Sequence, residues 1–77
     1  MSVLYHHGKD KYWCGTVPKV DDFEAPIVDE FYDAKSRMGP WGFMNPASFA
    51  IYGLGVGTGL GQRYKKQADG RWKKTEG

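Results

Sequence analysis

The chain has 77 residues, a formal net charge of +2 and one cysteine, Cys14. A chain of this length forms one small domain that buries only about 60% of its unfolded surface, and a single cysteine excludes an intramolecular disulfide bond. No apolar run is long enough to cross a bilayer, and the amino terminus lacks the apolar region of a signal peptide. We therefore expect a protein without membrane contact that stays in the compartment where it is made.

The charge is divided unevenly along the chain. Residues 19–33 carry six acidic side chains against Lys19, a net charge of −5, and residues 60–77 carry six basic side chains against Asp69 and Glu76, a net charge of +4. Such asymmetry is typical of a protein that presents one end to a charged partner. It is equally compatible with two solvated faces that attract each other.

The first elements predicted are two short strands, 3–6 and 11–16, joined by a turn at residues 8–10. Pro18 ends the second run, and the acidic segment 21–25 then forms a connecting loop. A second hairpin follows, because β-branched and aromatic residues favour a strand over 27–33, the turn residues 38–40 come next, and 41–44 supply the returning strand.

A short helix is predicted over residues 46–52. Asn45 is suited to the N-cap, and a proline occupies the first helical position, where its missing N–H costs nothing. Gly53 stands where a left-handed C-terminal residue is favoured. Phe49 and Tyr52, three residues apart, are expected to share one face of the helix.

Every second residue from Gly53 to Gly61 is glycine. A dinucleotide-binding loop needs glycines at relative positions 1, 3 and 6, but Thr58 and Leu60 occupy the sixth positions here. If the run is extended, one of its faces carries no side chains and allows an aromatic ring, a backbone or a ligand to approach closely. The other face carries the four residues between the glycines.

A basic hairpin is predicted at the end of the chain, where 63–66 and 71–74 flank the turn dipeptide Asp69-Gly70. With a loop of two residues, Lys66 faces Lys73. Like charges that face each other cost stability, so an anionic ligand or the acidic middle of the chain is needed to offset them.

This hairpin supplies the candidate binding residues. It combines bases with rings that could stack, the composition used for nucleic-acid backbones and unpaired bases. A solvated basic face is the alternative explanation. The candidates are Arg63, Tyr64, Lys65, Lys66, Arg71, Trp72, Lys73 and Lys74.

No catalytic or metal-binding pattern stands out. His6 and His7 are adjacent, and neighbouring residues of a strand point to opposite faces, so they do not converge on one ion. Cys14 has no partner in a catalytic order. We predict no enzymatic activity, no cofactor and no metal.

Two motifs are distinctive: Met38-Gly39-Pro40-Trp41 and the alternating glycines of 53–61. Together with the basic tail, residues 26–77 resemble a family of small bacteriophage-encoded proteins of zinc-ribbon type. In that family one CxxC pair precedes a hairpin with a Gly-Pro-Trp turn, and a second CxxC pair precedes the glycine run. The resemblance implies a phage origin and a zinc-ribbon-like fold, and it does not cover residues 1–25.

The cysteine positions of the family carry other residues in this chain. The resemblance places the second pair at Asn45 and Ser48 and the first at Val20 and Phe23. None of these side chains supplies the thiolate of a structural zinc site, so the implied domain is a ribbon without metal. Apolar packing, including Phe23, or the amino-terminal strands then replace the stabilisation that zinc provides.

The predicted fold is therefore α+β and mostly β, with two or three short hairpins, one helix over 46–52 and no metal. We expect a single domain over 1–77, made of amino-terminal strands (1–25), a degenerate ribbon core (26–62) and a basic hairpin arm (63–77).

The expected function is that of a phage-encoded, non-enzymatic binding module in the host cytoplasm. Its basic hairpin would bind nucleic acid or an anionic protein surface. One alternative is an inhibitor of a host protein or defence system, with either the hairpin or the acidic segment 21–33 as its contact surface. Another alternative is a virion or assembly component. The sequence leaves the partner and the oligomeric state open.

Overall fold

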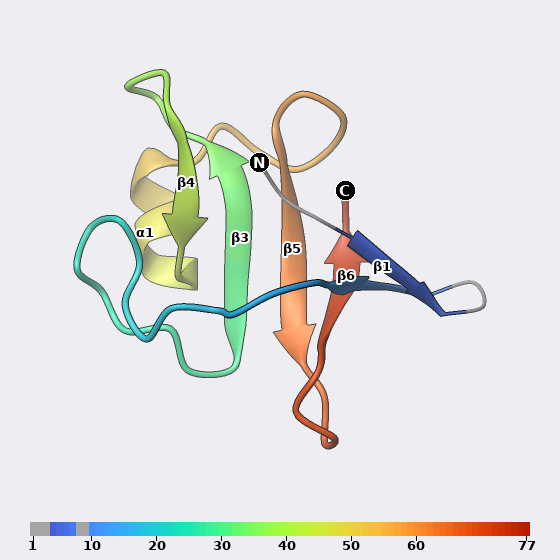
Figure 1. Ribbon diagram of the computed structural model, residues 1–77. Helices are drawn as coiled ribbons and strands as arrows, with labels where there is room; N and C mark the ends of the chain where they lie inside the picture. Colours follow the sequence, from blue (N-terminus) through green and yellow to red (C-terminus); the bar gives the residue numbers. More distant parts are fainter. Residues whose placement is uncertain (1–3, 8–9) are drawn as a thin grey trace.

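The structure, a computed structural model, describes residues 4–7 and 10–77. Within these residues six strands form one sheet in the order β1-β2-β6-β5-β3-β4, and each neighbouring pair is antiparallel (Figure 1). The elements are β1 (Leu4–His7), β2 (Asp10–Trp13), β3 (Glu30–Lys35), β4 (Trp41–Met44), α1 (Pro46–Tyr52), β5 (Gly61–Lys66) and β6 (Trp72–Glu76). The predicted class, a mostly β domain with short hairpins and one short helix, is confirmed.

The first hairpin joins β1 to β2, with Leu4 opposite Trp13 and His7 opposite Asp10. β2 ends at Trp13 rather than at residue 16, because the chain bends at Gly15, which has a φ of 113°. Residue 3 of the predicted first strand, and residues 8 and 9 of the predicted turn, lie outside the described residues.

The second hairpin joins β3 to β4. The strand predicted over 27–33 is displaced to Glu30–Lys35, because Ile27 donates its N–H to the carbonyl of Lys19 and so pairs with the preceding loop. The predicted turn is confirmed: Ser36 donates to the carbonyl of Pro40, and Gly39 has a φ of 107°. β4 has the predicted bounds.

α1 begins and ends at the predicted residues, and the Asn45 side chain caps it by accepting a hydrogen bond from the Ser48 N–H at 2.8 Å. The expected left-handed conformation of Gly53 is wrong, since its φ and ψ are −75° and 150°. Glycine is required there for space, because a Cβ would overlap the ring of Phe49. That ring stacks on Tyr32 of β3, with centroids 3.7 Å apart.

The glycine run is not extended, so the condition for a bare strand face is not met. Residues 53–60 form a loop with turns, in which Gly55, Gly57 and Gly59 have positive φ values that other residues rarely adopt. Only Gly61 lies in a strand, where a Cβ would stand 2.6 Å from the Cβ of Ala34 on β3. The period of two therefore reflects repeated turn conformations and not a bare strand face.

The core lies mainly on one face of the sheet. Phe31 and Tyr64 have no exposed surface, and Trp13 from the amino-terminal hairpin covers them. The Trp13 ring contacts Phe31, Phe43 and Tyr64 edge-on, with centroids 5.3 to 5.5 Å apart. α1 packs beside β3 and β4 at the other end of the sheet from β1 (Figure 1). Among the described residues, no helix has the length and apolarity that a membrane crossing requires.

Candidate functional site

The β5–β6 hairpin has a loop of three residues, and not the two residues on which the expected pairing of Lys66 with Lys73 depends. Gln67 donates to the carbonyl of Arg71, and Gly70, with a φ of 90°, donates to the carbonyl of Gln67. Asp69 fixes this turn by accepting from the backbone N–H of Arg71 at 2.9 Å. One extra loop residue moves the register, so that the opposed lysines are Lys65 and Lys73 and not Lys66 and Lys73.

Two of the predicted binding residues are used inside the protein. Arg63 forms ion pairs with Glu30 and with Glu76, and the hydrogen bond that its guanidinium donates to Glu30 is the main reason that the pKa of Arg63 is raised. Tyr64 has 0% exposure and stacks on Phe31 with centroids 5.1 Å apart. The predicted stacking of Tyr64 on a nucleic-acid base is therefore incompatible with the folded protein.

The other aromatic candidate is only partly accessible. Trp72 packs edge-on against Phe31 with centroids 5.2 Å apart, and the Lys66 ammonium lies 5.9 Å from the centre of its ring. Arg71 places its guanidinium 4.2 Å from the centre of the Tyr12 ring and pairs with Asp69 at 2.8 Å. These contacts hold the hairpin tip against β2.

The remaining lysines form the accessible part of the hairpin. Lys65 and Lys66 are exposed. Burial lowers the pKa of Lys74, and the charge of Lys11 lowers it further. Lys11, on β2, is exposed and was not predicted as a site residue, because the sequence gives no sign that β2 pairs with β6.

The acidic segment is less open than its composition indicates. Asp21 is 4% exposed, and its carboxylate accepts hydrogen bonds from the backbone N–H groups of Phe23, Ala25 and Asn45 at 2.8 to 2.9 Å. Burial alone would raise the pKa of Asp21, but hydrogen bonds from Ser48 and from these three groups outweigh it and lower the pKa. This carboxylate thus joins the loop after Val20 to the start of α1.

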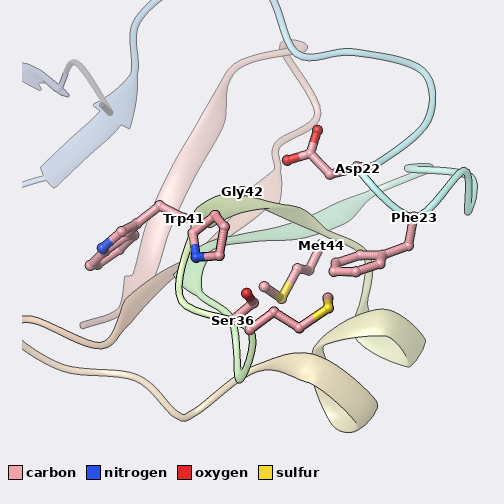
Figure 2. A pocket seen from close by; sticks show the side chains of 8 residues that line it. Asp22, Phe23, Ser36, Trp41, Gly42 and Met44 are labelled. Carbon is pink, nitrogen blue, oxygen red and sulfur yellow. The ribbon is translucent and has the colours of Figure 1, made fainter.

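Two hollows flank β4, and both are lined by Asp22, Trp41 and Gly42. The first, the apolar pocket, has a volume of about 280 Å³ and is completed by Phe23, Ser36, Met38, Pro40 and Met44. Figure 2 shows Phe23 pointing toward Met44, whereas the Trp41 ring turns away from this pocket. The second, the acid-aromatic pocket, has a volume of about 230 Å³ and is completed by Trp13, Asp33 and Phe43.

Among the side chains that the structure describes, no group of three or more His, Cys, Asp and Glu is placed to hold a metal ion. Cys14 is exposed and unbonded. The side chains of His6 and His7 lie outside this description.

No family model matches the chain, and neither a curated protein nor a solved structure matches it. The geometry of the surfaces described above is therefore the basis for a functional proposal.

Proposed function

We propose that this protein is a non-enzymatic binding module whose β5–β6 hairpin binds a polyanion, with nucleic acid as the first candidate. The observation that carries the proposal is the direct opposition of Lys65 and Lys73 in the sheet. The exposed Lys66 follows Lys65 on the strand and points to the other face, over Trp72. Opposed residues on one face of a sheet have Cβ atoms about 5 Å apart. Like charges that face each other on neighbouring strands cost stability unless opposite charge lies close to them.

The surroundings of the lysine pair favour an anionic ligand. Glu30 lies on the other side of Lys65 in register, but its carboxylate is already bonded to Arg63. The phosphates of a nucleic-acid backbone can contact several basic side chains at once, and the counterions of those phosphates are released on binding. Lys11 and Lys74 place further positive charge on the other face of β2 and β6, because neighbouring residues of a strand point to opposite faces.

Charge reversal at Lys65 and Lys66 tests the proposal. Fluorescence anisotropy with a labelled single-stranded oligonucleotide and with a duplex, over a series of salt concentrations, is expected to show salt-dependent binding. In Lys65→Glu/Lys66→Glu, the affinity should fall. The slope of the logarithm of the binding constant against the logarithm of the salt concentration should decrease in magnitude by about 2, one unit for each lost phosphate contact. The matched control is Lys19→Glu/Arg37→Glu, which changes the net charge equally at exposed positions outside the hairpin. Equal losses in the two double variants would contradict a specific role for the hairpin.

A second candidate function is the binding of a protein, such as a host defence component. The exposed Met38 and Trp41, 65% and 47% accessible, favour it because they border the apolar pocket. An affinity pull-down from bacterial lysate with and without nuclease separates the two functions, since only nucleic-acid capture depends on intact nucleic acid. The phage origin, the host cytoplasm as location and the virion role stay predictions from the resemblance.

A further inference from the structure

We propose that the acid-aromatic pocket beside Trp41 binds an organic cation, specifically the guanidinium group of an arginine side chain. This site lies on the face of the sheet that carries Trp13 and Phe31, whereas Lys65 and Lys73 of the hairpin point to the other face. It is independent of the polyanion binding proposed above.

Aromatic rings form the walls of this pocket. Trp41 and Phe43 alternate with Gly42 and Met44 along β4, so both rings lie on the face that Trp13 covers. Trp13 and Phe43 contact each other edge-on with centroids 5.3 Å apart, while Trp41 is 47% exposed and leaves one ring accessible. A cation placed over an indole face is attracted by the negative charge of the π system.

A buried carboxylate gives the pocket its charge. Asp33 lies two residues after Phe31 on β3, on the core face, and only 8% of its surface is exposed. Among the described residues no hydrogen bond or ion pair reaches its side chain. The Asp33 oxygens still contact solvent, since Trp13 Nε1 is the one fully buried and unbonded side-chain polar atom among the described residues. A cationic ligand would give this carboxylate an ion pair that the described residues do not supply.

Asp22 adds a second carboxylate at the rim. One of its oxygens, Oδ2, accepts a hydrogen bond from the Phe43 N–H at 3.0 Å, which fixes the side chain against the edge of β4. Lys35, the nearest cation in register, is opposite Trp41 and exposed, and no ion pair joins it to Asp22 or Asp33 in the described chain. The charges of the residues that the structure describes therefore leave both carboxylates available.

The combination of rings and carboxylates selects the guanidinium group. It is planar, stacks on an indole and directs several N–H groups toward carboxylates. A metal ion would not use the rings, and two carboxylates are too few ligands to hold it. The volume of about 230 Å³ suits one side chain and lies below the usual range for a drug-sized ligand.

Nuclear magnetic resonance with the full chain tests this site. The probe is N-acetyl-arginine amide, and the matched control ligand is N-acetyl-citrulline amide, which has a similar shape but a neutral urea. We expect the arginine probe to shift the indole N–H resonance of Trp41 in a saturable way, while the resonance of Trp72 on the hairpin stays in place. Equal shifts from the citrulline probe, or no saturable shift, would overturn the proposal.

Two variants test the residues. Asp33→Asn removes the charge at nearly constant shape, and Trp41→Leu removes the accessible ring; each is expected to weaken binding about tenfold. Asp29→Asn, an exposed acid outside the pocket, is the control for Asp33→Asn and should bind as the wild type does. Unchanged affinity in both test variants would overturn the proposal. A second result would also overturn it: without probe, the Trp41 resonance shifts with protein concentration, and this shift is absent in Lys65→Glu. The occupant of the pocket would then be the basic hairpin of a second copy.

Discussion

Asp21 does more for this fold than its place in a charged loop indicates. An aspartate among other acids in a proline-bounded segment predicts a solvated loop, and that prediction holds for its exposed neighbours Glu24 and Asp29. Asp21 instead turns inward, where three backbone N–H groups converge on its carboxylate. The sequence shows no sign of this, because the Asn45 donor is 24 residues away.

Replacing Asp21 is expected to destabilise the protein. Asp21→Ala leaves backbone N–H groups without their acceptor, at a cost of about 1–3 kcal/mol, while Asp21→Asn keeps one acceptor oxygen and should cost less. Urea denaturation followed by tryptophan fluorescence gives the free energy of unfolding. Asp29→Asn, at an exposed position, serves as the control and should stay within about 0.5 kcal/mol of the wild type.

The same residue predicts a pH dependence. Because the folded state lowers the pKa of Asp21, its contribution to stability is fully present above the pKa of the unfolded chain, about 3.9. It is lost as the pH falls through the lower pKa of the folded state. The difference in stability between the wild type and Asp21→Asn should therefore shrink below about pH 4. A difference that grows on acidification would contradict this assignment.

At the scale of elements, local signals predicted α1 and β4 to the residue. An N-cap, a proline at the first helical position and a turn act within a few residues, and these interactions decided both boundaries. The predictions that failed concern elements whose bounds or register depend on residues outside the element. Ile27 pairs with an earlier loop, and the β5–β6 register follows from one extra loop residue fixed by Asp69.

Asn45 tests how far the helix depends on its cap. Its Oδ1 accepts from the Ser48 N–H, and its Nδ2 donates to the carbonyl of Pro26 at 3.0 Å. Asn45→Ala loses both bonds and should lower the free energy of unfolding by about 1–2 kcal/mol. Asn45→Ser keeps a capping oxygen but not the amide donor, so an intermediate value is expected. Equal losses in both variants would mean that the contact with Pro26 carries the effect.

For the candidate site, the sequence predicted which kinds of residue the hairpin carries but not how their side chains are arranged. The basic residues do lie on one hairpin, but Tyr64 is buried in the core and Arg63 forms ion pairs inside the protein. Side chains alternate between the two faces of a strand, so the residues on the core-facing side are buried. The acid-aromatic pocket brings together residues from β2, the loop after it, β3 and β4. No short motif spans those elements, so the sequence could not show it.

At the scale of the whole molecule, the amino-terminal hairpin completes the core. β2 pairs with β6, the last strand, and places Trp13 over three rings. The expectation that the amino-terminal strands stabilise the domain has a physical basis in this contact. The pairing of the second strand with the sixth is a non-local arrangement that no turn signal specifies.

Trp13→Ala should therefore affect the entire fold. A loss of about 3 kcal/mol is expected for removing a largely packed tryptophan, from a total stability of roughly 4–12 kcal/mol for a chain of this size. The midpoint of thermal unfolding should fall by roughly 15 °C, as circular dichroism can measure. Trp41→Ala, which removes an indole that is 47% exposed, is the matched control and should lower the midpoint far less.

The strand order also determines how the two charged sites influence each other. The charge of the acid-aromatic pocket lies on Asp33 of β3, which is opposite Gln62 on β5, three residues from Lys65. A strand rises about 3.3 Å per residue, so roughly 10 Å separates the sites, whereas charges in physiological salt are screened over about 8 Å. A ligand at one site should hardly alter affinity at the other, and one rigid sheet could then hold a polyanion and a basic side chain together as a short bridge between partners of opposite charge.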